Sequence, residues 1–150
     1  MIRKAEIKDI PNILEMAHGF YNDAIYDKKL GYSEKDFSEY IRFLIGSEFT
    51  CVFLLENNSK IIGTVSGIIS PWFMDKSDII VTEQWVWVET EHRGNGSFVK
   101  LINELVSWGK GRGANKLSMV AIGSTTEKQV KSFYERMGFQ YMETHFIKEI

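Results

Sequence analysis

The sequence TEHRGNGSFVKLINELVSWGKGRGANK spans Thr90–Lys116 and predicts a strand-to-helix turn. A strand pattern rich in aromatic residues comes first, and it is followed by Arg93, Gly94 and Gly96. The apolar residues after the turn then recur at helical spacing: Phe98, Leu101, Ile102, Leu105 and Trp108. Glycines at 109, 111 and 113 end the helix.

A glycine turn of this kind is suited to hold a phosphate. The first amides of a helix have no intrahelical partners, and the helix dipole favours an anion beside them. Gly94 and Gly96 allow the backbone to approach phosphate oxygens, because they carry no Cβ atom. Arg93 adds a cation, and Ser97 adds a hydroxyl or simply caps the helix. The alternative is a tight turn without any ligand.

Two common nucleotide-binding motifs do not fit this turn. A mononucleotide P-loop requires Gly-Lys-Ser/Thr, which does not follow Gly96. A dinucleotide-binding fingerprint requires a third glycine at another offset and an acidic residue about 20 residues later. The next strand pattern, Lys116–Ile122, has no such acid.

The order of the predicted elements indicates an α/β (α+β) fold: a mixed, mostly antiparallel sheet of six to seven strands with helices on both faces. Helices are expected after Asp9, after the cap residue Ser33, after Gly96 and after the cap residue Thr126. The predicted strands are Ile2–Ala5, Thr50–Glu56, Ile61–Ser70, Asp78–Glu89, Lys116–Ile122 and the C-terminal FQYMETHFIKEI with a bend near Glu143–Thr144. No linker or repeat interrupts the chain, so residues 1–150 are expected to form one domain.

Composition excludes several classes of function. The formal net charge is -2, so no overall attraction to nucleic acid or to an anionic membrane is expected. No stretch of the sequence is long and apolar enough to span a bilayer, and the N-terminus lacks a signal-peptide pattern. The expected location is the cytoplasm.

No metal site is expected. The single cysteine, Cys51, stands in the apolar run TCVFLLE and is interpreted as a buried hydrophobic residue. His18, His92 and His145 have no ligand spacing.

Two motifs together resemble the GNAT superfamily of N-acetyltransferases. Arg93-Gly94-Asn95-Gly96-Ser97-Phe98 resembles the acyl-CoA loop of that family, although Phe98 replaces a small residue and could reshape the first turn of the helix. Val130–Gln140, VKSFYERMGFQ, resembles the closing helix of the family. Its tyrosine position is occupied by Tyr134. The order of elements matches the family across nearly the whole chain.

The resemblance implies transfer of an acetyl group from acetyl-CoA to a primary amine, by direct attack in a ternary complex. A small molecule is favoured over a protein N-terminus as the acceptor. The implied acetyl-CoA-binding residues are Trp87, Val88, Arg93, Gly94, Asn95, Gly96, Ser97 and Phe98. An amide near Trp87–Val88 would hold the acetyl oxygen, and Tyr134 would protonate the departing thiolate. The alternative is a non-catalytic acyl-CoA sensor or interaction module of the same fold.

An alkyl ammonium has a pKa of about 10.4, so deprotonation at pH 7 costs roughly 4–5 kcal/mol. A general base can offset part of this cost. Glu83 is the candidate, because strand alternation would place it on one face with Trp85 and Trp87. A bulge would change that arrangement, and Gln84 or a bound water is the alternative base.

Specificity for the acceptor is expected from the first two helices and from Ser70–Asp78. The aromatic residues of this region could line an acceptor pocket or form a homodimer contact: Tyr21, Tyr26, Tyr32, Trp72 and Phe73.

Overall fold

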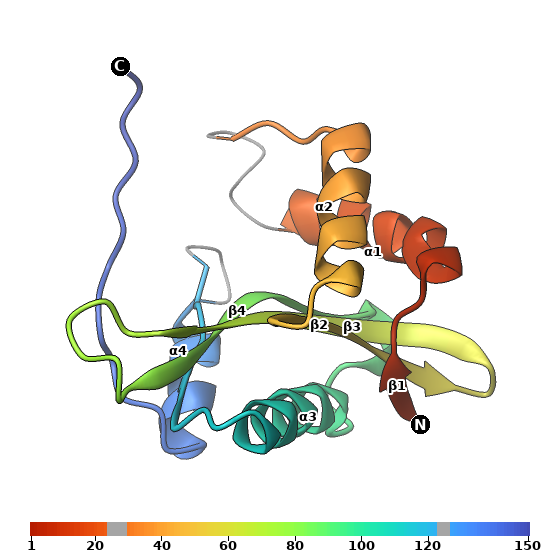
Figure 1. The fold of residues 1–150 in the computed structure, drawn as a ribbon. Coiled ribbons are helices and arrows are strands. Elements are labelled where there is room, and N and C mark those ends of the chain that lie inside the picture. Colours follow the sequence, from red (N-terminus) through yellow and green to blue (C-terminus); the bar gives the residue numbers. More distant parts are fainter. Residues whose placement is uncertain (24–29, 123–126) are drawn as a thin grey trace.

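The structure is a computed structural model that describes residues 1–23, 30–122 and 127–150 (Figure 1). Its centre is a five-stranded sheet with the order β1-β2-β3-β4-β5. Neighbouring strands are antiparallel except for the parallel pair β4 and β5, which confirms the predicted mixed, mostly antiparallel sheet. The strands are β1 (Ile2–Lys4), β2 (Thr50–Asn57), β3 (Lys60–Pro71), β4 (Ile79–Val88) and β5 (Lys116–Ser118).

Helices cover both faces of the sheet, as predicted. α1 (Ile10–Asp23) and α2 (Glu34–Gly46) lie on one face, and α3 (Ser97–Gly111) and α4 (Glu127–Arg136) lie on the other (Figure 1). Short 3-10 turns, η1 (Ile7–Asp9) and η3 (Thr90–His92), precede α1 and α3. Ser33 caps α2 as predicted, because its hydroxyl accepts the Asp36 N–H at 3.3 Å. The predicted cap Thr126 lies outside the described residues.

Each face has its own apolar core. The core on the α3 face includes Val65, Val81, Leu101 and Leu105, and none of these four side chains is more than 1% exposed. The core on the opposite face includes these residues of α1, α2 and the sheet: Ile13, Ile41, Leu44, Leu54 and Trp85. Burying one such aliphatic side chain contributes roughly 1.5–3 kcal/mol, so the two cores fix the helices on the sheet.

Cys51 belongs to the core on the α3 face and is 4% exposed, which confirms its interpretation as a buried hydrophobic residue. Burial raises the pKa of the thiol to about 12. The Sγ atom lies 3.7 Å from the Gly67 carbonyl oxygen, to which the thiol donates.

The strand count differs from the prediction, because the C-terminal segment does not join the sheet. Residues 139–150 have no regular structure, and Figure 1 shows them leading away from the sheet. Every side chain from Gln140 onward is exposed, including Phe146 at 94%. Alternating apolar residues favour a strand only when a neighbouring strand covers them. No strand among the described residues does so here, and five strands are observed in place of six to seven.

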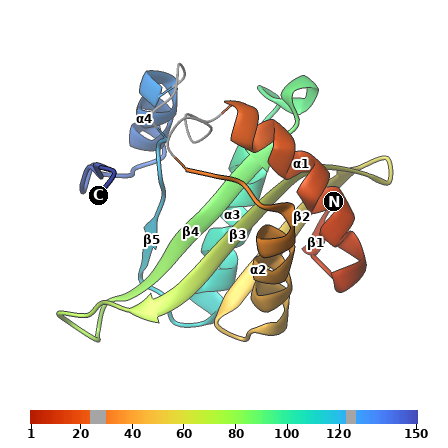
Figure 2. The same ribbon diagram turned by 90° about the horizontal axis from the view of Figure 1, so that it is seen from above.

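β4 and β5 pair only over a short distance. Their contacts run from Ile80 opposite Lys116 to Thr82 opposite Ser118. Beyond this point the two chains diverge toward their carboxyl ends (Figure 2). The second half of β4 is therefore paired with β3 on one edge and with no strand of the described sheet on the other.

Candidate active site

A β-bulge lies where β4 and β5 begin to diverge. Glu83 pairs with Gly67 and Trp85 pairs with Ser66, so Gln84 is an extra residue in β4. The extra residue places Glu83 and Trp85 on opposite faces of the sheet. The expectation that these two side chains share a face is therefore wrong, because regular alternation ends at the bulge.

Glu83 is a buried carboxylate on the face of α3 and α4, and its side chain reaches the segment after β5. Glu83 is 9% exposed, and its Oε2 accepts the N–H of Val120 at 2.9 Å. Burial raises the pKa of Glu83 to about 7, whereas the Val120 hydrogen bond acts in the opposite direction. Near neutral pH this carboxyl can therefore either accept or release a proton.

Tyr134 of α4 meets the same backbone segment. Its hydroxyl donates to the Val120 carbonyl oxygen at 3.3 Å. Burial raises the pKa of Tyr134 well above its ordinary value, and the negative charge of Glu83 raises it further. The structure therefore brings the two predicted catalytic side chains together through one residue, Val120. No sequence pattern marks Val120, because it takes part through its backbone.

The predicted phosphate-binding turn has the conformation that its glycines suggest. Gly94 and Gly96 have φ angles of +81° and +82°, which side chains rarely tolerate. A Cβ atom at either position would meet no atom within 4 Å, so the space in front of the turn is open. Gly96 is the N-cap of α3, and Asn95 accepts the Ser97 N–H at 3.1 Å and the Ser97 hydroxyl at 2.5 Å.

The first turn of α3 closes normally despite Phe98. Lys100 donates its N–H to the Gly96 carbonyl at 3.0 Å. The Phe98 ring packs against Phe133 and Tyr134 of α4, with ring centroids 5.3 and 6.4 Å apart. The residue that departs from the family pattern thus joins α3 to the helix that carries Tyr134.

Arg93 ties the turn to the end of β4. Its Nε donates to the Val88 carbonyl at 2.9 Å, and its guanidinium lies 4.3 Å from the centroid of the Trp87 ring. The Val88 carbonyl therefore faces away from β3, and the Val88 N–H points the same way. The Glu89 N–H, in contrast, bonds Ile62 of β3. Because N–H directions alternate along a strand, the Trp87 N–H also points toward β3. Of the two amides predicted to hold the acetyl oxygen, the Val88 N–H is therefore the one that points to the free edge of β4.

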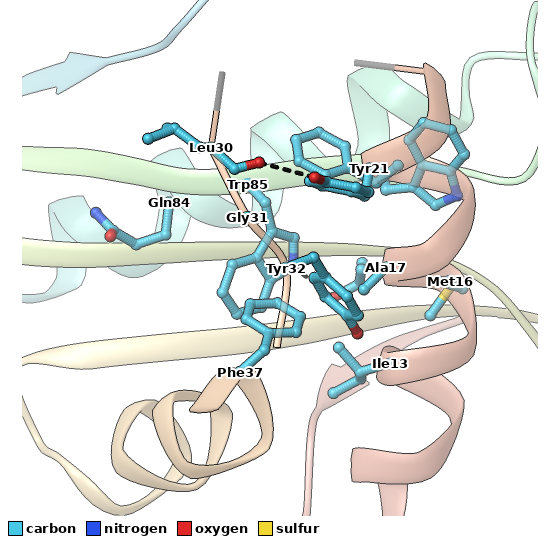
Figure 3. Close-up of a pocket in the computed structure, with 13 residues that line it drawn as sticks. Ile13, Met16, Ala17, Tyr21, Leu30, Gly31, Tyr32, Phe37, Gln84 and Trp85 are labelled. Carbon is cyan, nitrogen blue, oxygen red and sulfur yellow. Dashed lines mark hydrogen bonds between the residues drawn. The ribbon is translucent and has the colours of Figure 1, made fainter. Parts of the chain in front are cut away.

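An apolar pocket of ≈ 210 Å³ lies on the opposite face of the same part of β4. Figure 3 shows its walls, which come from α1, from residues 30–37 and from strands β3 and β4. Tyr21 and Tyr32 line it, as the sequence suggests. Trp72 and Phe73 are not among its lining residues, and Tyr26 lies outside the described part of the chain. The β4 residues of the pocket are Gln84, Trp85 and Trp87.

Among the described residues, no three His, Cys, Asp or Glu side chains are grouped so that they could hold a metal ion. Within residues 1–23, 30–122 and 127–150, no helix combines the length and hydropathy needed to cross a membrane.

One family match covers both the glycine turn before α3 and the helix that carries Tyr134. The sequence matches the Acetyltransferase (GNAT) family over residues 12–139, and the chain belongs to this family. No curated protein matches the chain by sequence.

Solved structures share the fold at low sequence identity. A transcriptional regulator from Bacillus halodurans C-125 superposes with a TM-score of 0.81 at 17% identity, covering 100% of this chain and 99% of that one. A predicted acetyltransferase from Clostridium acetobutylicum, solved with acetyl-CoA, has a TM-score of 0.76 at 22% identity and coverages of 99% and 95%. Glucosamine-6-phosphate N-acetyltransferase from Arabidopsis thaliana has a TM-score of 0.76 at 20% identity and coverages of 99% and 97%.

Proposed function

We propose that residues 1–150 act as one N-acetyltransferase domain that transfers the acetyl group of acetyl-CoA to a primary amine by direct attack. The observation that carries this proposal is the pairing of Glu83 and Tyr134 through Val120, beside the unpaired edge of β4. One group near neutral pKa and one protonated hydroxyl are the acid–base pair that amine acetylation requires. Fold and family alone would fit a non-catalytic module equally well.

The residues around the turn fit acetyl-CoA as the acyl donor. The pyrophosphate would meet the backbone amides of the turn around Gly94 and Gly96, where an added Cβ would touch no atom within 4 Å and the first amides of α3 have no intrahelical partners. The Ser97 N–H is already bonded to the Asn95 side chain, which would have to turn away for this amide to take part. Arg93 contributes a positive charge at the same turn. The acetyl arm would lie along the free edge of β4, where the Val88 N–H would hold the acetyl oxygen.

Glu83 serves as the general base in this proposal. A base is most effective when its pKa lies near the working pH, and burial brings the pKa of Glu83 to about 7. The pocket and the Glu83 carboxyl lie on opposite faces of β4. The proton therefore leaves the amine past the strand edge, either directly or through one water molecule. Gln84 faces the pocket, where its Oε1 accepts the Tyr40 hydroxyl at 2.5 Å, and remains the alternative position for a water-mediated base.

Tyr134 serves as the general acid for the departing thiolate. Its raised pKa keeps the hydroxyl protonated at neutral pH, so a proton is available. The negative charge of Glu83 is one cause of that raised pKa. Once Glu83 has taken a proton from the amine, this charge is gone and Tyr134 becomes a stronger acid. Proton uptake at one residue thus favours proton release at the other.

The test measures acetyl-CoA binding and CoA thiol release across a panel of amines. Acetyl-CoA at 100 times its Kd should stabilise the folded protein by about 2.7 kcal/mol, and ATP or NAD should stabilise it much less. Turnover with at least one amine supports the enzyme. Binding without turnover on any amine supports the non-catalytic module, and equal stabilisation by ATP contradicts the acetyl-CoA site.

A further inference from the structure

We propose that the acceptor is a monoamine with a compact apolar body, best an aromatic ring, which binds in the pocket beside β4. This inference rests on the proposed N-acetyltransferase function, because it assigns the acceptor class of that same site. It is carried by the composition of the pocket wall, by the partners of its polar groups and by its size.

Four neighbouring aromatic rings form part of the pocket wall. Tyr21 lies 5.4 Å from Tyr32, Tyr32 lies 6.1 Å from Phe37, and Phe37 lies 5.3 Å from Trp85, measured between ring centroids. In Figure 3 these rings surround the space between α1, α2 and β4, and Ala17 of α1 faces them. Such a wall offers edge and face contacts to another ring and a cation–π contact to an ammonium group.

The polar groups in the wall are mostly bonded within the protein. The Tyr21 hydroxyl donates to the Leu30 carbonyl at 2.7 Å (Figure 3). Thr64 accepts the indole N–H of Trp85 at 3.3 Å, and the Gln84 carbonyl oxygen accepts the hydroxyl of Tyr40. Two other wall residues carry a buried polar atom without a hydrogen-bond partner among the described residues: the Tyr32 hydroxyl and the Trp87 indole N–H. A ligand therefore meets at most these two unpaired polar groups, and the rest of the wall offers it apolar contact.

The lack of charged side chains among the described lining residues also disfavours highly polar acceptors. Among the described residues that line the pocket, none is Asp, Glu, Lys, Arg or His. A polyamine or a sugar phosphate would lose its hydration there without a countercharge from these residues. An apolar body instead gains free energy from every carbon that it buries.

The pocket has room for a body of this size. A closed apolar cavity of about 150 Å³ is large enough to bind benzene. The ≈ 210 Å³ here suits a phenyl ring with a short alkyl arm. The arm can place the amine at Trp85 and Trp87, next to the free edge of β4.

The first experiment compares kcat/KM for 2-phenylethylamine and ethylamine, with spermidine and glucosamine 6-phosphate as polar acceptors. Burial of the phenyl ring should raise kcat/KM about 10- to 100-fold over ethylamine. Equal values for the two monoamines, or a higher value for either polar acceptor, would overturn the inference and leave the acetyltransferase proposal intact.

The second experiment narrows the pocket with Ala17→Leu. This variant should lower kcat/KM for 2-phenylethylamine about 10-fold more than it lowers kcat/KM for ethylamine, because only the larger body fills the pocket. The matched control is Phe49→Ala, which removes an exposed ring that does not line the pocket. Equal losses for both amines in Ala17→Leu would contradict recognition of the apolar body.

Calorimetry that measures the Kd of each amine for the CoA-bound protein separates the recognition inference from the acetyltransferase proposal. If no amine is turned over, the acetyltransferase proposal fails. The recognition inference then stands only if 2-phenylethylamine binds at least about 10-fold more tightly than ethylamine. Equal binding of the two amines overturns it.

Discussion

Replacing Glu83 by Gln should change how the free energy of unfolding depends on pH. Burial raises the pKa of Glu83 from 4.5 to about 7 in the folded protein. Between these two values the folded state binds a proton that the unfolded state has released. The wild-type protein therefore loses stability as the pH rises through this window, and the loss levels off about one unit above the folded pKa.

The magnitude follows from the two pKa values. Each pH unit corresponds to about 1.36 kcal/mol, so the buried charge costs about 3 kcal/mol above pH 7. Glu83→Gln keeps the volume and an acceptor for the Val120 N–H but cannot ionise. Between pH 5 and pH 8, the difference in unfolding free energy between the variant and the wild type should therefore shift by about 2.5 kcal/mol in favour of the variant, because part of the loss has already occurred at pH 5. For a chain of this length, that shift corresponds to roughly 5–10 °C in Tm.

Urea denaturation of both ligand-free proteins at pH 5, 6, 7 and 8 measures this difference. The other titrating groups cancel in the comparison. The control is Glu135→Gln, which removes an exposed carboxylate from α4 and should not change the pH dependence. If the wild type and Glu83→Gln give parallel curves, Glu83 does not have a raised pKa, and the argument for it as the base fails.

Three other substitutions test the remaining parts of the site. Tyr134→Phe should lower kcat about 10²- to 10⁴-fold while acetyl-CoA affinity stays nearly constant; an unchanged kcat would assign the ring to packing alone. Gly96→Ala should weaken acetyl-CoA binding measured by calorimetry, because φ is +82° there. Gly111→Ala, at a glycine without positive φ, is the control, and equal affinities would make the turn purely structural. Phe98→Ala should reduce kcat more than it raises the KM for acetyl-CoA, because the ring supports Tyr134; the reverse pattern would place Phe98 at the acyl donor instead.

Local patterns predicted the part of the site that depends on local structure. The strand, glycine turn and helix around Arg93–Phe98 are short-range features, and the structure places them as expected. The cap at Ser33 is of the same kind. These predictions succeeded because each depends on residues only a few positions apart.

The geometry around Glu83 could not be predicted in this way. One extra residue, Gln84, reverses the face of every later side chain in β4, and nothing in the local sequence marks it. The contact with Val120 depends on where β4 and β5 diverge, which is a tertiary feature. The C-terminal segment shows the same limit, because its alternating pattern gives a strand only where a neighbour is available.

The burial of Cys51 has a practical consequence for every measurement that counts free CoA. It is the only cysteine in the chain, and in the folded protein its thiol is both shielded and, with a pKa of about 12, almost never ionised. Thiol-reactive dyes attack thiolates. They should therefore report the released CoA without a background signal from the enzyme. After denaturation the same thiol becomes reactive, so one dye molecule per chain would count the unfolded fraction directly.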